Sequence, residues 1–385
     1  MGKLGGSHVA VYDSYGKLPA DVTAFLANYS SDELCLSGSW FELLARYSPE
    51  KGHGVRIYAV RSSEPATVDC LLFAMSATPA RRPRKLLSLT NFYTMSYAPL
   101  LRPGLIDVQA TLNALASFIA RERPRWDMVE LRGCIAEQPV TTQLSQAFRQ
   151  AGLLTDSFAQ FDNWFYPTNG IGPADYFKAR PSQVRNTITR KLKKVQKEHK
   201  IDFELHRTPE DLPPGAEAWQ KIYAQSWKEP ELYPDFIPQL LRRSAELGQL
   251  RLGVLRVDGE AAAAQIWLLT GGRATIYKLA YDEKFSSLSV GSLLTKMMFD
   301  YVLENDTITE VDYGIGSESY KLDWMSDCRH IVGLVGFNRF SLMGLTAALR
   351  HRMGRLARAK LQKERDASAS GDTPPANVIT EGVAR

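Results

Sequence analysis

The sequence predicts an α+β protein made of two similar domains that lie side by side. The chain has 385 residues, which suggests two domains at about 150 residues each. Residues 251–282 read as three antiparallel strands joined by tight turns. Each half of the chain also repeats one order of elements: a meander, a loop, a helix, a strand, a helix and a strand.

Composition excludes several other classes of protein. Apolar residues make up 44% of the chain and charged residues 23%, which excludes collagen, coiled coil and wholesale disorder. No apolar run approaches the roughly 18 residues of a membrane-spanning helix, and residues 1–7 lack the apolar stretch of a secretory signal. Four widely spaced cysteines without a CxxC pair predict buried, reduced thiols, no metal site and a cytoplasmic location: Cys35, Cys70, Cys134 and Cys328.

The first domain is predicted over residues 8–166. Alternating or β-branched runs predict strands at residues 55–61, 67–77, 85–92, 127–132 and 158–166. Helical spacing of apolar residues predicts a helix over 108–121 and another over 140–151, which Gly152 ends. Turn formers then fill residues 167–173, and the domain boundary is placed there.

The second domain is predicted over residues 174–340. Helices are expected at residues 184–200, 215–227, 234–247 and 290–304, with a short helix at 317–324. The meander strands are 251–257, 261–270 and 273–282, and further strands are expected at 311–314 and 330–338. Asp258-Gly259 and Gly271-Gly272 form the meander turns, because such turns need positive φ.

Positive charge is concentrated in two segments of a chain whose net charge is only +5. Residues 178–200 hold nine basic residues and one acid, and residues 350–365 hold seven and one. Both segments read as amphipathic helices. For 184–200 we favour a packed surface helix with a solvated basic face. For 341–365 that interpretation is balanced against binding to a membrane surface or a partner, and residues 366–385 are predicted to be a disordered tail.

A candidate phosphate site lies where the third meander strand gives way to a helix. Residues 284–292 combine Lys284, Gly291 and four serines, of which Ser287, Ser289 and Ser292 could add hydroxyl hydrogen bonds. The first amides of a helix lack partners within the helix and attract anions. The alternative is a serine that simply caps the helix. The segment has neither the GK[ST] of a Walker loop nor a GxGxxG fingerprint.

A candidate proton-transfer cluster follows in residues 310–321. Asp312 lies within a short strand, and Glu318, Tyr320 and Lys321 come after a pair of glycines. Carboxylates, a phenol and an amine at a strand end are suited to proton transfer. The alternative is that Glu318 and Lys321 are ordinary surface residues and that Asp312 is a structural hydrogen-bond acceptor.

Together, the run TIYKLAYDEKFSSLSVGSLLTKMMFDYV and the later VDYGIGSESYKLDW resemble the GNAT-type acetyltransferases associated with cellulose and exopolysaccharide biosynthesis, the CelD/BcsL type. The resemblance covers about residues 176–339 and, more loosely, the N-terminal half. It departs at Val290, where many members have proline. It implies a tandem GNAT fold of two mixed sheets flanked by helices, similar in architecture to the Fem transferases.

The resemblance also implies that acetyl-CoA or another acyl-CoA is the cosubstrate. Its pantetheine arm would lie between strands 273–282 and 311–314. The implied cofactor-binding residues are Leu279, Tyr281, Ser287, Leu288, Ser289, Val290, Gly291 and Ser292.

The implied reaction is direct acyl transfer to an amine or hydroxyl of a saccharide or other envelope-related acceptor. Asp312 or Glu318 would accept the nucleophile's proton, and Tyr320 would protonate the departing thiolate, with Lys321 in the same cluster. The N-terminal domain would shape the acceptor cleft without binding CoA. Aromatic residues are candidates for lining that cleft: Trp40, Phe92, Tyr93, Tyr97 and Trp164.

Two alternatives stay open at this point. One is a Fem-like transferase that uses charged tRNA, although no long coiled-coil arm is evident. The other is a non-catalytic scaffold of a polysaccharide-synthesis complex. Contact with the inner membrane face or with a polysaccharide synthase is expected through residues 342–365. No helix-turn-helix or finger pattern supports DNA binding.

Overall fold

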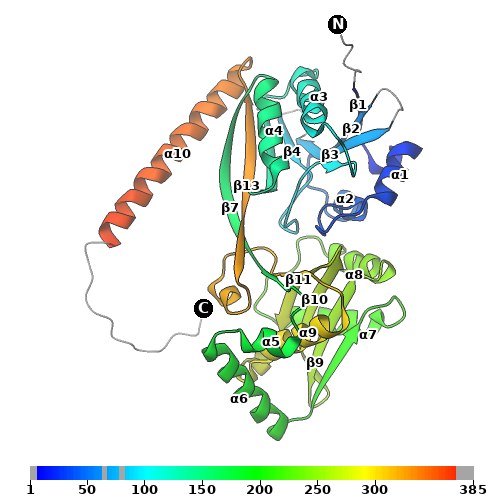
Figure 1. The fold of residues 1–385 in the computed structure, drawn as a ribbon, viewed down its shortest axis with the longest axis vertical. Helices are drawn as coiled ribbons and strands as arrows, with labels where there is room; N and C mark the ends of the chain where they lie inside the picture. The colour runs from blue at the N-terminus through cyan, green and yellow to red at the C-terminus, as the bar shows by residue number, and fades with distance from the viewer. Residues whose placement is uncertain (1–6, 63–66, 78–82, 370–385) are drawn as a thin grey trace.

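The computed structural model describes residues 7–62, 67–77 and 83–369. The chain forms two lobes, one from each half of the sequence (Figure 1). The paired strands β7 (Leu153–Pro167) and β13 (Asp327–Asn338) run between the lobes. The long helix α10 (Leu342–Ala369) extends along one side of the molecule.

The remaining strands are β1 (His8–Tyr12), β2 (His53–Arg61), β3 (Val68–Ala77), β4 (Lys85–Ser88), β5 (Leu100–Leu101), β6 (Met128–Ile135), β8 (Ile201–His206), β9 (Leu250–Val257), β10 (Glu260–Thr270), β11 (Arg273–Tyr281) and β12 (Glu310–Asp312). The remaining α-helices are α1 (Ala20–Asn28), α2 (Gly38–Tyr47), α3 (Val108–Arg121), α4 (Pro139–Gln150), α5 (Pro173–Lys178), α6 (Ser182–Glu198), α7 (Leu212–Ala224), α8 (Phe236–Glu246) and α9 (Val290–Asn305). Short 3-10 turns are η1 (Tyr15–Lys17), η2 (Glu283–Leu288) and η3 (Ser319–Asp323).

The two predicted sheets are joined edge to edge into one 13-stranded mixed sheet. Its order is β1-β2-β3-β4-β6-β13-β7-β12-β11-β10-β9-β8, with β5 paired to β3. Strand β13 pairs with β6 of the N-terminal half, while the end of β7 pairs with β12 of the C-terminal half. Strand pairing therefore crosses the boundary predicted at residues 167–173, because each half supplies one strand to the other.

Apolar packing also connects the halves. Helix α8 lies on the core of the N-terminal half, where Phe236 packs edge-on against Trp40 at 5.7 Å between ring centroids. A second core gathers around α9, with Phe299 stacked between Tyr176 and Trp324. Burial of such side chains is the main contribution to the stability of the fold.

Most predicted elements are present with small changes in their bounds. Helix α3 has the predicted ends. Helix α10 runs to Ala369, four residues into the segment predicted as a tail, and residues 370–385 lie outside the described residues. Within the described chain, no helix is both long enough and apolar enough to cross a bilayer.

Candidate functional site

Strands β11 and β12 diverge as expected. They pair in parallel over only three positions, from Arg273 with Glu310 to Thr275 with Asp312. The chain then turns at Gly314, whose φ is +67°; a Cβ there would lie 3.2 Å from the Ile276 carbonyl oxygen. Strand β11 continues to Tyr281 with β10 on its other side. Its edge beyond Thr275 has no strand partner in the described sheet, so an extended ligand can bond there.

The start of α9 carries unpaired amides. Ser289 adopts the left-handed conformation, with φ 58° and ψ 35°, and its own N–H donates to the Ser286 carbonyl. Among the described residues, the amides of Val290, Gly291 and Ser292 have no hydrogen-bond partner. Lys191 of α6 donates to the Ser287 carbonyl at 2.7 Å and brings positive charge to this turn. These groups form an anion site.

A cleft of about 560 Å³ lies between α6, β11 and the start of α9. Five of the predicted cofactor-binding residues line it: Leu279, Tyr281, Ser289, Gly291 and Ser292. The other three do not. Val290 is fully buried in the core, Leu288 packs against that core, and Ser287 contributes the carbonyl that Lys191 binds. Lys284, considered for charge, pairs with Glu260 on the surface instead.

A second cavity, of about 220 Å³, lies beyond the junction of the two strands. It shares Leu279, Tyr313 and Tyr320 with the first cleft. Its other polar side chains belong to Tyr93, Lys228, Tyr277, Lys278, Glu318 and Lys321. A third cavity, in the N-terminal half, shares Phe92 and Ile315 with the second. The three hollows thus follow one another from α9 to the N-terminal half.

Tyr320 stands where the first two cavities meet. Its ring is 43% exposed and lies edge-on to Tyr313 at 5.7 Å between centroids. Burial and the nearby Glu318 carboxylate raise the pKa of Tyr320 to about 12. The phenol therefore keeps its proton at neutral pH and can donate a hydrogen bond into either cavity.

Lys321 and Glu318 form an ion pair with unequal exposure. The Lys321 ammonium is buried and donates to the carbonyls of Ile315 and Gly316 at 2.5 and 3.2 Å, and it lies 3.0 Å from Glu318. Burial lowers the pKa of Lys321. Burial raises the pKa of Glu318, but the hydrogen bonds from Lys321 and the backbone, together with the charges of Lys321 and Lys228, outweigh it, so that pKa lies below its usual value. Lys321 thus fixes the loop, and Glu318 presents a carboxylate to the second cavity.

Asp312 lies beneath the site and outside both cavities. Its Oδ1 accepts hydrogen bonds from Asn163 Nδ2 and from the Gly314 amide, both at 2.7 Å. The side chain is buried at the point where β12 ends. This geometry is that of a structural hydrogen-bond acceptor that shapes the Gly314 turn. Glu318 is then the carboxylate that lines the second cavity.

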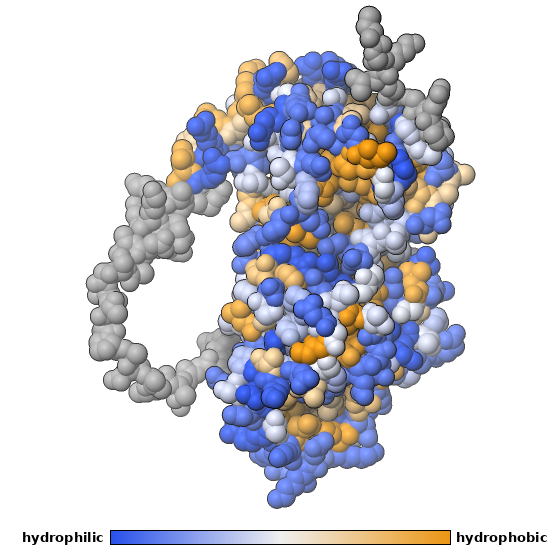
Figure 2. Space-filling model, in the orientation of Figure 1, coloured by the Kyte–Doolittle hydropathy of each residue, from blue (hydrophilic) through white to orange (hydrophobic). Residues whose placement is uncertain are grey.

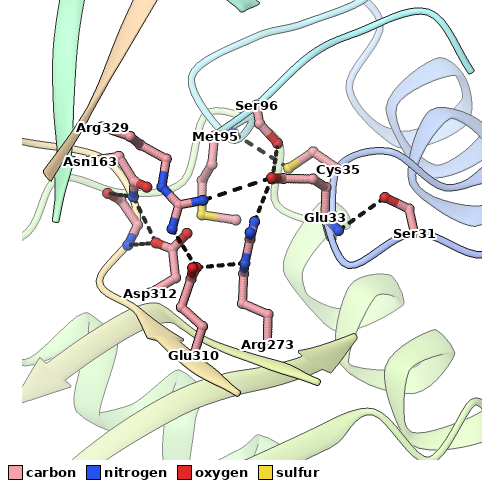
Figure 3. A network of polar contacts seen from close by, with 11 residues as sticks. Ser31, Glu33, Cys35, Met95, Ser96, Asn163, Arg273, Glu310, Asp312 and Arg329 are labelled. Carbon is pink, nitrogen blue, oxygen red and sulfur yellow. Dashed lines mark hydrogen bonds and ion pairs between the residues drawn. The ribbon is translucent and has the colours of Figure 1, made fainter. Parts of the chain in front are cut away.

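A buried charge network next to Asp312 connects the two halves (Figure 3). Arg273 lies 2.6 Å from Glu33 and 2.7 Å from Glu310, and Arg329 also binds Glu310. These residues come from the segment before α2, from β11, from β12 and from β13. Burial raises the pKa of Glu310 in spite of its two arginine neighbours. The network fixes the base of the divergent strands to the N-terminal half.

The sequence analysis missed the residues that the loop between α7 and α8 brings to the site. Glu231 of this loop accepts from Tyr93 and from Lys278, both at 2.6 Å. Trp227 packs against Tyr281 and lines the first cleft, while Lys228 faces the second cavity. The sequence offered one signal for these residues: a short segment between two predicted helices that combines aromatic and charged side chains.

The corresponding parallel strands in the described part of the N-terminal half, β4 and β6, are arranged differently. Strands β4 and β6 pair in parallel, but the Tyr97 amide then donates to the Gly133 carbonyl at 2.7 Å. Residues before Ala98 therefore fill the gap. Of the five aromatic residues proposed for the acceptor cleft, Phe92 and Tyr93 line the second cavity. Trp40 and Tyr97 are buried in the first core, and Trp164 is partly buried against the second core.

Three of the four cysteines are buried as predicted, and Cys328 is not. Cys35, Cys70 and Cys134 are buried and unpaired, and Cys328 is partly exposed. The structure brings Cys328 near Asp162 and His330, with one potential ligand atom of each residue within 4.8 Å of the others. The spacing of the cysteines did not suggest this group. His330 is already bound to Glu137 at 2.7 Å.

Comparisons with known proteins agree with this geometry. Residues 182–322 match the family described as Acetyltransferase (GNAT) domain. FemX is similar in structure, with a TM-score of 0.57 at 12% identity over 82% of this chain and 94% of FemX. A conserved protein of unknown function from Bacteroides thetaiotaomicron gives 0.53 at 13% identity over 86% of this chain and 100% of its own.

The C-terminal domain of a putative lysylphosphatidylglycerol synthetase from Agrobacterium fabrum gives a TM-score of 0.51 at 13% identity, over 86% of this chain and 93% of that domain. No curated protein matches the chain. At such low identity these likenesses establish the fold. The chain has an α+β GNAT-type fold, and the match to the GNAT acetyltransferase family lies within its second half.

Proposed function

We propose that the protein transfers an acyl group from acyl-CoA to an amine or hydroxyl of a saccharide or other small envelope-related acceptor. The observation that carries the proposal is the opening between β11 and β12, with unpaired amides at one end and Tyr320 at the other. The residues present fit the cosubstrate. The start of α9 and Lys191 suit its pyrophosphate, and the free edge of β11 suits the pantetheine amides.

Both substrates would be bound together, so that positioning supplies much of the rate. The nucleophile would attack the thioester carbonyl from the second cavity, and the carbon–sulfur bond would break as the new carbon–nitrogen or carbon–oxygen bond forms. Glu318 is the best-placed carboxylate to accept the nucleophile's proton, directly or through water. Tyr320 would donate a hydrogen bond to the sulfur as it gains negative charge.

The finer assignments rest on the sequence resemblance. We propose a role in cellulose or exopolysaccharide biosynthesis and a cytoplasmic location on that ground. A Fem-like use of charged tRNA is the second candidate, and the basic helix α6 beside the first cleft favours it, because an RNA phosphate could bind there. A non-catalytic scaffold is the third.

A thermal-shift experiment tests the cosubstrate. At about 100 times its Kd, acetyl-CoA should stabilise the protein by about 2.7 kcal/mol, which is about 3 °C for a chain of this length. Gly291→Glu and Ser292→Glu should abolish the shift by placing a carboxylate against the phosphates. Ser292 is exposed, so its variant tests charge without disturbing the packing of Gly291 on Tyr281.

Gly172→Glu is the matched control, because a side chain there meets no atom within 4 Å. Mass spectrometry of a product formed from acyl-CoA and cell-envelope extract would then identify the acceptor. Binding of charged tRNA without any response to acyl-CoA would favour the Fem-like alternative. A cellular phenotype that survives Tyr320→Phe would favour the scaffold.

A further inference from the structure

The second cavity has an excess of positive charge. Lys228, Lys278 and Lys321 line it, against the single carboxylate of Glu318. Two of these lysines have anionic partners: Lys278 lies 2.6 Å from Glu231, and Lys321 lies 3.0 Å from Glu318. Among the described residues, the Lys228 ammonium has neither a hydrogen-bond nor an ion-pair partner.

The nearby carboxylates are already engaged. Glu231 accepts hydrogen bonds from both the Lys278 ammonium and the Tyr93 hydroxyl, each at 2.6 Å. Glu318 is tied to Lys321. Lys228 is left half-buried with its ammonium 5.5 Å from the centre of the Trp227 ring. Burial and the Lys278 charge lower the pKa of Lys228.

An unpaired, half-buried ammonium is costly, and an anion from outside the chain offsets the cost. The position of Lys228 ties that anion to the reaction. It shares the second cavity with Tyr320 and Glu318, whereas its neighbour Trp227 lines the first cleft. The loop between α7 and α8 therefore faces the acyl donor with one residue and the acceptor side with the next.

We propose, on the premise of the transferase function above, that the acceptor carries an oxyanion, a carboxylate or a phosphate, which Lys228 binds in the second cavity. The nucleophilic amine or hydroxyl then lies toward Tyr320 and Glu318. Lys228 is a specificity residue in this arrangement.

Calorimetric titration of the full chain with inorganic phosphate and with acetate, at constant ionic strength, tests the site. The protein is first saturated with CoA, so that the α9 amides are occupied. Either anion should bind saturably, and Lys228→Ala should weaken binding at least about tenfold, the loss expected for a charge-assisted contact. Lys228→Arg should restore it. Lys284→Ala, at the surface pair with Glu260, is the control.

Two results would overturn the proposal: no saturable binding of either anion, or binding that Lys228→Ala leaves unchanged. If the unaltered protein does not bind CoA at all, the proposed transferase function is refuted instead. The product labelled from radioactive acetyl-CoA and envelope extract gives a second readout. It should be retained by an anion exchanger, and release by a phosphatase would distinguish phosphate from carboxylate; a neutral product would refute the inference.

A second inference concerns helix α10. The helix packs on the rest of the protein through the face that holds Gly344, His351 and Arg355. Gly344 leaves no room for a Cβ, which would lie 2.3 Å from the Asn338 carbonyl oxygen. Farther along, His351 contacts the rings of Phe158 and Phe337, and Arg355 binds Asp156 at 2.8 Å.

The predicted apolar stripe of α10 lies on the other side, in solvent. Its members are 43–79% exposed and repeat at helical spacing: Leu342, Leu345, Leu349, Met353 and Leu356. Figure 2 shows apolar and polar residues alternating along the coloured part of this helix. The exposed residues Arg350 and Arg352 flank the stripe, and residues 350–365 hold seven basic residues and one acid.

The positive charge of α10 indicates what kind of partner covers this apolar stripe. Two copies of so basic a helix would repel each other side by side, whereas anionic headgroups would attract it while the leucines enter the acyl boundary. We infer that α10 docks the protein on an anionic lipid surface.

Co-sedimentation of the full chain with phosphatidylcholine vesicles, with and without phosphatidylglycerol, tests this inference. Binding should require phosphatidylglycerol and fall with salt. The double variant Leu349→Glu/Met353→Glu and the charge variant Arg350→Glu/Arg352→Glu should each lose it. Ile106→Glu is the control, because Ile106 is a fully exposed apolar residue that is far from α10 in the sequence.

Equal binding to neutral vesicles, or sedimentation of the Leu349→Glu/Met353→Glu variant like the unaltered protein, would overturn the lipid assignment. So would a concentration-dependent dimer in light scattering that the same double variant abolishes, because the stripe would then be covered by a second copy.

Discussion

Tyr320→Phe removes one hydroxyl from the junction of the two cavities and tests the proposed chemistry directly. The expected role of that hydroxyl follows from its pKa, which burial and Glu318 raise to about 12. A thiol has an ordinary pKa of about 8.5. Full proton transfer from the phenol to the departing thiolate would thus be uphill by about 5 kcal/mol. A hydrogen bond that strengthens as the sulfur gains charge is the favourable alternative.

The magnitude follows from that role. Loss of one donor to developing charge typically lowers kcat by about 10²–10³-fold. Tyr320 is 43% exposed, so water can replace part of the interaction, and we expect the lower end, about 10²-fold or 2.7 kcal/mol in the barrier. The KM for acetyl-CoA should hardly change, because the contact strengthens only in the transition state.

The assay is CoA release from acetyl-CoA, followed with a thiol reagent, in the presence of the acceptor identified from extract. Tyr301→Phe is the matched control, because its hydroxyl bonds Arg207 on the surface. Between about pH 7 and pH 10 the unaltered enzyme should show no loss of rate from ionisation of Tyr320. An unchanged kcat in Tyr320→Phe, or an alkaline loss of rate near pH 8 that the variant abolishes, would refute the reasoning.

Three further predictions concern the supports of the site. Glu33→Gln removes one of two carboxylates from buried Arg273, and because Glu310 remains we expect a loss of about 3 kcal/mol in the free energy of unfolding, measured by urea denaturation. Lys321→Met leaves two carbonyls unbound and should cost about 2 kcal/mol, with a larger relative loss of kcat because the loop loosens. Glu231 has a pKa below its ordinary 4.5, since its hydrogen bonds outweigh burial. It therefore stabilises the fold above that pH and loses this contribution as the pH falls through the folded value, so the stability gap to Glu231→Gln should close in acid.

Controls keep these predictions separable. Glu246→Gln changes an exposed ion pair and should leave the urea midpoint unaltered. A Glu33→Gln protein as stable as the original would show that the network in Figure 3 contributes little. If Lys321→Met retains full kcat, the loop that Lys321 holds is not needed for catalysis. A stability gap for Glu231→Gln that is independent of pH would contradict the lowered pKa of that carboxyl.

Local signals in the sequence located the meander turns and the start of α9 well. The meander turns have the positive φ that their sequences require, at Asp258 and Gly259 and at Gly271 and Gly272. Helix α9 begins at Val290, and the predicted Ser289, Gly291 and Ser292 line the first cleft. Turn chemistry and helix starts depend on a few neighbouring residues, so they can be predicted without the fold.

The residues of the second cavity could not be grouped from the sequence, because they meet only through the tertiary structure. Lys228, Glu231, Lys278 and Tyr93 meet only because α8 packs on the N-terminal half and places the loop before it over β11. Asp312 is ambiguous by sequence, since a carboxylate at a strand end serves either as a base or as a structural acceptor. Its bonds to Asn163 and to the Gly314 amide became visible only once β7 lay beside β12.

The sequence by itself determined most of the elements, the basic helices and the start of α9, because hydrophobic spacing, turn residues and charge act over short stretches of chain. The tertiary structure alone decided which strand pairs with which. The exchange of β7 and β13 between the halves, the ion pairs among Glu33, Arg273, Glu310 and Arg329, and the outward face of α10 all follow from contacts between distant residues. Such contacts depend on how the two cores pack together, and local sequence patterns do not predict that packing.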